Sequence, residues 1–264
     1  MVEKMVETMS LLKENFNHLQ YIGLWCPVKW SSNSWKSRVY RIYTISIIGA
    51  LYWFGVTESI SLFTIVDSVE DFSDSSFMLL TAIVVCVKVD MILMKKSEII
   101  ALITTLEGHP HKPINTDEEV ILDEFIGRIR LISWIYGGVV EASVWAMTIS
   151  VFFQDIPYGD LPYKAWIPYN YSTPIFYWLT FCLQLLVVIF VANVACGFDT
   201  ALLGFFMLVC AQFNILRDRL EKAVGELETA IVKSHEDIFG AMEICERRIV
   251  DCVKYHRAIF EYVG

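Results

Sequence analysis

The chain has 264 residues, of which 55% are hydrophobic, 14% aromatic and only 19% charged, and its mean hydropathy is +0.49. Because soluble proteins contain about 25% charged residues, this composition excludes a soluble or disordered chain and favours a protein embedded in a lipid bilayer. The formal net charge is −9 with no basic cluster, which excludes a nucleic-acid-binding protein.

Residues 1–41 are predicted to be a cytoplasmic segment that carries a short helix at the membrane surface. Apolar residues recur there at three- and four-residue spacings, at Met5, Met9, Leu12, Phe16 and Leu19. Charged residues interrupt this region, so no apolar run reaches the length of a signal peptide and we expect no cleaved leader.

Four apolar stretches are predicted to cross the membrane as helices, because a helix needs about 20 apolar residues to span roughly 30 Å of hydrocarbon. They lie at about residues 42–66, 77–94, 131–153 and 175–195. Apolar character continues from the fourth stretch to Phe213, and a helix of about 40 residues is about 60 Å long. This region is therefore either two packed spans or one helix that projects far beyond the bilayer.

The distribution of lysine and arginine separates these alternatives, since both residues concentrate on the cytoplasmic side of membrane proteins. Six lie before the first span, five between the second and third, eight after Phe213, and only Lys164 in the two remaining loops. A fifth span would place the last eight outside the cell. We therefore predict an all-α membrane protein, a helical bundle with four transmembrane helices, both termini in the cytoplasm, and a long fourth helix projecting into the cytoplasm.

Residues 214–264 are predicted to form a cytoplasmic helical hairpin. An apolar stripe continues along the fourth helix in steps of three and four, at Phe213, Leu216, Leu220, Val224, Leu227 and Ile231. Ser234 and Asp237 form a candidate capping box, so a second helix is expected to start there and run to the end of the chain.

Four charged residues lie inside predicted spans, namely Glu58, Lys88, Asp90 and Glu141. Glu58 is about 24 Å along the first span, so it can lie near the far interface, and Asp90 lies close to the inner interface and needs no special role. Lys88 is about 9 Å from the inner edge of the second span, so its ammonium can extend to the cytoplasmic headgroups. Glu141 is about 15 Å deep in the third span and must be neutral, paired or next to water. Lys88 is the candidate partner of Glu141 in a structural pair, and a ligand-reading role for Glu141 is the alternative.

Motifs for catalysis and cofactor binding are missing from the sequence, so we predict neither an enzyme nor a cofactor. The seven cysteines are an odd number, and none falls in a predicted outer loop, which disfavours a disulfide framework. Cys245 and Cys252 lie near His256, but their spacing matches no common zinc pattern, so no metal site is predicted. Asn170 begins an Asn-Tyr-Ser acceptor for N-linked sugar in a predicted outer loop.

Three segments resemble the insect odorant receptor family. LPYKAWIPYNYSTPIFYWLTFCLQ, from Leu161 to Gln184, is similar to the segment that leads from the outer loop into the fourth helix of these receptors. DTALLGFFMLVCAQFNILRDRL, at 199–220, is similar to the continuation of that helix, and VKYHRAIFEYV, at 253–263, is similar to the approach to the fifth. The resemblance extends over the whole chain.

The resemblance implies a subunit of seven helices that assembles as a tetrameric, odorant-gated cation channel with a co-receptor subunit. It also implies a place in the cell membrane of olfactory neuron dendrites. By this comparison the sequence holds helices one to four and part of the anchor between subunits, without the seventh, pore-lining helix. We therefore expect either a fragment or a truncated product. The alternatives are a four-span adaptor or regulatory protein that docks through the apolar stripe, and a gustatory receptor of the same fold.

The resemblance further implies an odorant site in the outer half of the bundle, where aromatic and aliphatic side chains provide affinity and a few polar groups provide orientation. Candidate residues share this outer position on helices two, three and four, and they are Thr81, Val84, Glu141, Trp145, Thr148, Phe152, Tyr177, Phe181 and Gln184. An aromatic face at helical spacing is more often a sign of ordinary packing or of lipid contact than of a binding site.

Overall fold

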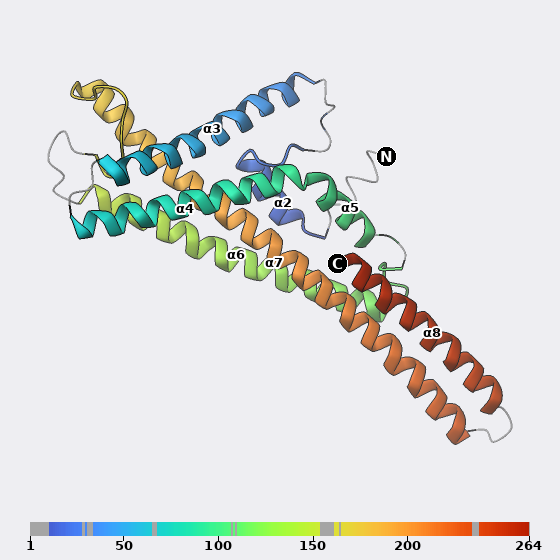
Figure 1. Cartoon of the computed structure of the whole chain (residues 1–264). Helices are drawn as coiled ribbons and strands as arrows, with labels where there is room; N and C mark the ends of the chain where they lie inside the picture. Colours follow the sequence, from blue (N-terminus) through green and yellow to red (C-terminus); the bar gives the residue numbers. More distant parts are fainter. Residues whose placement is uncertain are drawn as a thin grey trace.

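The structure is a computed structural model that describes residues 11–27, 30, 34–64, 68–106, 108, 110–153, 161–163, 165–233 and 238–263. The regular elements in these ranges are helices: α2 (Lys13–Tyr21), α3 (Trp35–Thr64), α4 (Val69–Met94), α5 (Lys96–Leu106), α6 (Thr116–Val151), α7 (Pro174–Lys233) and α8 (Ile238–Val263) (Figure 1). Four of them, α3, α4, α6 and α7, are long and apolar enough to cross a membrane. Met5, Met9 and the candidate capping box at 234–237 lie outside the described residues.

The long helices begin where their first residues suit a helix N-terminus. Ser68 accepts a hydrogen bond from the Asp71 N–H at 3.1 Å, so α4 begins before the predicted residue 77. Three acidic residues occupy the first turn of α6, where they face the positive end of the helix dipole. Pro174 begins α7, because the N–H that proline lacks has no partner at this position. Polar first turns therefore extend these helices beyond the apolar stretches of the sequence.

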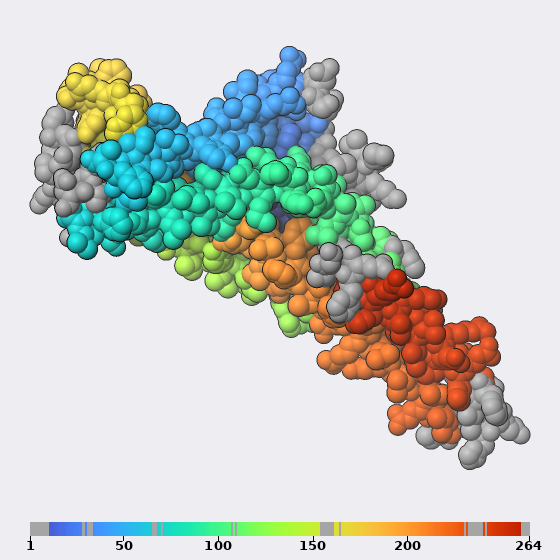
Figure 2. Space-filling model, viewed as in Figure 1, coloured from blue at the N-terminus to red at the C-terminus, as the bar shows by residue number. Residues whose placement is uncertain are grey.

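The fourth apolar stretch and its continuation form one helix, because α7 runs for 60 residues without a break. At 1.5 Å per residue, α7 is about 90 Å long, about three times the hydrocarbon thickness. Figure 2 shows the result as an elongated molecule in which the far half of α7, together with α8, projects from the main body of the bundle.

The short helix α2, which the sequence predicts at the membrane surface, packs its apolar face against other helices of the bundle. Phe16 and Leu19 are buried in the main hydrophobic core, together with Trp25, which has an exposed fraction of 0%. The Asn15 side chain donates a hydrogen bond to Ser133 Oγ on α6 at 2.9 Å. The described residues of the predicted apolar face, Leu12, Phe16 and Leu19, are therefore covered by protein.

Two glycines on α7 explain why α2 can approach so closely. A Cβ atom at Gly197 would lie 2.9 Å from His18 Cδ2, and one at Gly204 would lie 2.6 Å from Leu12 Cδ2. These glycines are seven residues apart and therefore lie on the same face of α7. The missing side chains leave a groove on α7, and α2 occupies it.

The helices α7 and α8 lie side by side in an antiparallel hairpin (Figure 1). Ile215 on α7 packs against Tyr255 and Ile259 on α8, and all three are buried. The apolar stripe that the sequence shows on α7 lies mostly off this contact, since Leu220, Val224 and Ile231 stay exposed.

Candidate ligand-binding site

An aromatic cluster lies at the end of the bundle where α6 ends and α7 begins, and we refer to it as the loop-end cluster. Its buried members are Val151, Tyr177, Phe181 and Leu185, and Leu161, Tyr163 and Tyr171 pack against them. The Phe181 ring centroid lies 6.0 Å from that of Tyr177, 5.4 Å from that of Trp178 and 5.8 Å from that of Phe152. Aromatic rings at these distances gain attraction beyond the burial of their area.

The loop before α7, of which residues 161–163 and 165–173 are described, is held over this cluster by hydrogen bonds. The Gln184 side chain donates from Nε2 to the Tyr163 carbonyl at 3.1 Å and accepts at Oε1 from the Tyr163 N–H at 3.5 Å. The Tyr169 and Thr180 hydroxyls are 2.7 Å apart, and the Trp166 N–H donates to the Thr57 carbonyl on α3 at 3.4 Å. Gln184 therefore holds the loop in this structure.

Tyr163 adds a polar group that has not been satisfied. Its hydroxyl is buried and has no hydrogen-bond partner among the described residues. Burial also raises the pKa of Tyr163, so this hydroxyl keeps its proton at neutral pH and can act as a donor. A buried unpaired hydroxyl is costly, and a ligand or a water that accepts a hydrogen bond from it would remove that cost.

The structure brings some of the predicted site residues together. Thr148, Tyr177, Phe181 and Gln184 are buried at the loop end, and Phe152 contacts the Phe181 ring at the edge of the loop-end cluster. These residues come from the last turns of α6 and the first three turns of α7.

Other candidates lie away from the loop-end cluster. Trp145 and Val84 are exposed, and Thr81 is half-buried with its hydroxyl bonded to the Phe77 carbonyl at 2.9 Å. The face of α4 that enters the core is a different one, formed by Ala82, Val85, Val89 and Ile92. Spacing alone identified apolar faces on α4 without showing which one its neighbours cover.

The partner of Lys88 differs from the one predicted. Its Nζ lies 2.7 Å from Oδ1 of Asp199 on α7, in place of the expected pair with Glu141. The Tyr136 hydroxyl on α6 donates to the other oxygen of Asp199 at 3.4 Å. Glu141 is half-buried, one turn beyond Gly137, whose nearest neighbour is Cys196 of α7. The prediction failed because α4 packs against α7, whereas Glu141 on α6 faces α7 at another level.

Glu58, which the sequence predicts near the far membrane interface, is buried inside the protein. Its exposed fraction is 1%, and Oε1 has no hydrogen-bond partner among the described residues. Glu58 continues the buried face formed by Ile47, Leu51 and Phe54. This spacing of three and four residues was the signal in the sequence that could have identified it as buried.

Two further predictions concern exposed and buried side chains. Asn170 is exposed, and its side-chain oxygen accepts a hydrogen bond from the Ser172 N–H at 2.9 Å, so glycosylation at this site stays a prediction. Cys245 and Cys252 are buried free thiols on α8. Among the described residues, no three His, Cys, Asp or Glu side chains are grouped to hold a metal.

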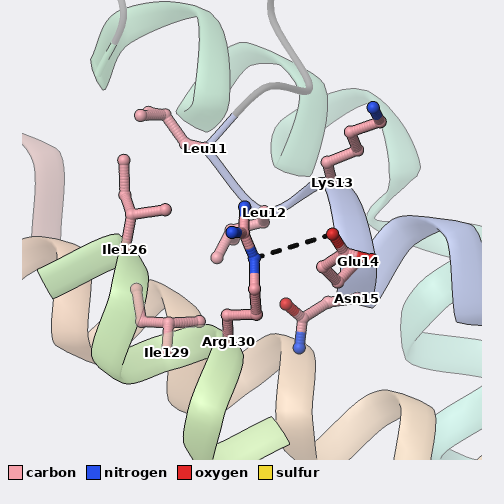
Figure 3. Close-up of a pocket in the computed structure, with 8 residues that line it drawn as sticks. All are labelled: Leu11, Leu12, Lys13, Glu14, Asn15, Ile126, Ile129 and Arg130. Carbon is pink, nitrogen blue, oxygen red and sulfur yellow. Dashed lines mark ion pairs between the residues drawn. The ribbon is translucent and has the colours of Figure 1, made fainter. Parts of the chain in front are cut away.

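A small niche lies where α2 meets α6 (Figure 3). Its sides include Leu12 and Ile129, and an ion pair between Glu14 Oε1 and Arg130 Nε, at 3.6 Å, lies across it. The cavity volume is about 10 Å³. That is room for a single water at most, so this niche is no candidate for a ligand site.

Four long apolar helices around a buried short helix, with a loop-covered aromatic cluster at one end, define a multi-pass helical membrane protein. Comparison with known families matches residues 68–264 to the family described as 7tm odorant receptor. The chain therefore belongs to the 7tm odorant receptor family, which confirms the resemblance seen in the sequence.

Individual relatives agree with this assignment. Odorant receptor 46a, isoform A, from Drosophila melanogaster is 27% identical over 162 residues, which are 61% of this chain and 39% of the relative. The insect olfactory receptor OR5 from Machilis hrabei has a similar fold, with a TM-score of 0.69 at 15% identity over 98% of this chain and 69% of that receptor. The same receptor in complex with eugenol gives a TM-score of 0.68 at 16% identity.

Proposed function

We propose that this chain is the ligand-binding portion of an odorant receptor subunit, and that small, apolar, volatile molecules bind at the loop-end cluster. The observation that carries the proposal is the burial of Tyr177 and Phe181 beside Thr148 and Gln184, under a loop held by hydrogen bonds. Aromatic side chains supply contact area to a ligand that offers few hydrogen bonds. Thr148 and the free Tyr163 hydroxyl supply the few polar groups that orient it.

The remaining candidates keep a place in this proposal. Val84 and Trp145 are exposed, and Thr81 and Glu141 are half-buried away from the loop-end cluster, so these four would contact a ligand only together with further helices of a complete receptor. The family assignment supports such helices, because the chain covers 69% of the solved olfactory receptor. In a complete subunit we expect ligand binding to open a cation-conducting pore.

Both chain ends are proposed to lie in the cytoplasm, with the hairpin of α7 and α8 projecting from the inner membrane face. The excess of lysine and arginine on the segments assigned to that side supports this orientation. Epitope tags at Met1 and Gly264 test it, because staining of either tag on intact, unpermeabilised cells would contradict it. A place in the dendrites of olfactory neurons is proposed on the family assignment alone.

A co-receptor subunit is the proposed partner, and the hairpin offers the surface for it. Leu220, Val224 and Ile231 on α7 and Met242 and Val253 on α8 are exposed apolar side chains outside the bundle. Exposed apolar patches of this kind mark protein interfaces. The same surface supports the second candidate function, a regulatory chain that docks on complete subunits without conducting ions itself.

Ligand binding is tested with the purified chain in lipid nanodiscs. Volatile esters, ketones and phenols, with eugenol among them because of the solved complex of OR5, are titrated while tryptophan fluorescence is followed. Replacing Phe181 with alanine should weaken binding about tenfold or more, since a large aromatic contact is lost. Leu183→Ala, on an exposed face of the same helix, is the matched control and should leave the affinity unchanged.

Two outcomes would contradict the proposal. One is the absence of saturable binding by any ligand of the panel. The other is an equal loss of affinity in the Phe181 and Leu183 variants, because that result would reflect a general disturbance of α7. Channel function is measured separately, as ligand-evoked cation current when the chain is co-expressed with a co-receptor subunit.

A further inference from the structure

A cavity larger than the niche between α2 and α6 lies away from the loop-end cluster, beside the middle of α7. Its volume is about 340 Å³, within the range of roughly 300–1,000 Å³ that is usual for small-molecule sites. It lies between α2, the end of α4, the start of α5 and the middle of α7. Apolar side chains form most of its wall, among them Phe16, Met91, Leu202 and Phe205.

Trp25 lines this cavity and carries a buried polar group that has no partner among the described residues. Trp25 is completely buried, and its indole Nε1–H has no hydrogen-bond acceptor among the described residues. A buried donor without an acceptor is rare in folded proteins, because its lost hydration is not replaced. The cavity therefore lacks one thing that a ligand could provide, which is a hydrogen-bond acceptor next to Trp25.

The charge around this donor indicates that the acceptor is anionic. Lys95 lines the cavity, and the Nζ of Lys96 lies 5.0 Å from the centroid of the Trp25 ring. Lys95 Nζ is paired with Glu98 Oε1 at 2.7 Å, but both side chains are more than half exposed. Such an exposed pair is weak and can exchange one acceptor for another. Lys95 and Trp25 therefore line the cavity together, and the Lys96 ammonium lies over the Trp25 ring.

We propose that this cavity binds a medium-chain fatty acid, whose alkyl chain lies along α7 and whose carboxylate accepts from Trp25 Nε1 and faces Lys95. The apolar wall fits the alkyl chain, since each methylene that leaves water contributes to binding. The carboxylate satisfies the buried indole donor and is attracted by the ammonium of Lys95, which lines the cavity. This site is separate from the loop-end cluster and does not depend on odorant binding there.

The position of the ligand is tested by photo-cross-linking, which separates a bound molecule from one dissolved in the bilayer. The 264-residue chain in phosphatidylcholine nanodiscs is irradiated with decanoic acid that carries a diazirine at the end of its alkyl chain. Cross-links should concentrate on α7 near Leu202, Phe205 and Val209 and disappear with excess unlabelled decanoic acid. Cross-links spread evenly over the exposed faces of α3, α4 and α6 would overturn the proposal.

The chemistry of recognition is tested by titrating decanoate into chain variants. Trp25→Phe keeps the ring but removes the N–H, and it should weaken binding roughly tenfold, the effect of one hydrogen bond to a charged acceptor. Trp134→Phe, at an exposed tryptophan on α6, is the matched control and should leave affinity unchanged. Glu98→Gln should strengthen binding, because it frees Lys95 from its carboxylate partner.

Cavity filling provides a variant that does not disturb Trp25. Leu202→Trp should abolish saturable binding, whereas Leu203→Trp, at the next position of α7 and outside the cavity wall, should not. Decyltrimethylammonium, which has a similar chain and the opposite charge, should fail to compete. Equal competition by this cation, or equal affinities in the Trp25 and Trp134 variants, would overturn the proposal. Phe181→Ala should leave decanoate binding unchanged, so failure at one site is distinguishable from failure at the other.

Discussion

The ion pair between Glu118 and Arg219 offers a quantitative test of how the hairpin is joined to the bundle. Glu118, in the first turn of α6, has an exposed side-chain fraction of 1%, and Arg219 on α7 has one of 16%. Two hydrogen bonds join them, from Arg219 Nε to Oε1 at 2.8 Å and from the terminal nitrogen to Oε2 at 2.7 Å. The Ile114 N–H also donates to Oε2 at 2.8 Å, so the carboxylate is well satisfied.

Replacing Glu118 with glutamine should reduce the free energy of unfolding by about 3 kcal/mol. Removing one member of a buried pair costs about 3–5 kcal/mol, and the partial exposure of Arg219 places this pair at the lower end. Most of that cost comes from the Arg219 charge, which stays buried without a counter-ion. Arg217 and Glu221 form an exposed pair at 2.8 Å, so Glu221→Gln is the matched control and should cost about 0.5 kcal/mol or less.

Unfolding is measured in mixed micelles with increasing amounts of sodium dodecyl sulfate, by loss of the far-ultraviolet circular dichroism signal. A second readout uses Cys252, which is buried on α8 and whose pKa burial raises. The thiolate is the reactive form, so maleimide labelling of Cys252 should be slow in the parent chain. The Arg219 guanidinium lies 4.4 Å from the Tyr255 ring centroid, and losing its orientation should loosen α8 and speed labelling.

A double variant decides whether the cost comes from an unpaired charge. Combining Glu118→Leu with Arg219→Met removes both charges, and its stability should return to within about 1 kcal/mol of the parent or exceed it. The reasoning is refuted if Glu118→Gln costs less than about 1 kcal/mol, or if the double variant is no more stable than Glu118→Gln.

Three further predictions concern the interior of the bundle. Gly197→Val should displace α2 and lower the free energy of unfolding by about 1–3 kcal/mol in the same micelle assay. Gly127→Val, at a position with nothing within 4 Å of an added Cβ, should not, and equal stabilities of the two variants would contradict the groove on α7. Gln184→Leu should cost about 1–2 kcal/mol and speed amide hydrogen exchange at 161–173, and unchanged exchange would show that this side chain does not hold the loop. Lys88→Asp and Asp199→Lys should each lower the free energy of unfolding by about 2–3 kcal/mol, and the double variant should recover more than half of that loss. A double variant without such recovery would exclude a specific pair.

The interior of the hairpin shows what the sequence could and could not indicate. Helical spacing predicted an apolar stripe on the continuation of the fourth helix, but α8 packs on a neighbouring face that includes Ile215 and Gln212. Tyr255 donates a hydrogen bond to the Gln212 side chain, and burial raises the pKa of Tyr255 to about 12, so this donor keeps its proton. Polar residues inside the contact gave no apolar signal, so hydropathy could not find this face.

The loop-end cluster was predicted in part for a similar reason. Tyr177, Phe181 and Gln184 share one face of a single helix, and helical periodicity places them together whatever surrounds that helix. Their arrangement with Tyr163 depends on how the loop returns over α7, and short polar and aromatic loops carry no periodicity that fixes a path. The role of Gln184 as a partner of the loop backbone therefore came only from the structure.

The order and character of the long helices were determined by the sequence alone, because bilayer thickness and the 1.5 Å rise of a helix translate apolar length directly into spans. The continuity of α7 was also predicted from the sequence, because apolar residues continue up to Phe213 and a further span would place the eight lysines and arginines after Phe213 outside the cell. Partners between helices were decided only by the tertiary structure. Lys88 meets Asp199, and α2 fills the groove at Gly197, because packing selects among several faces that periodicity leaves equivalent.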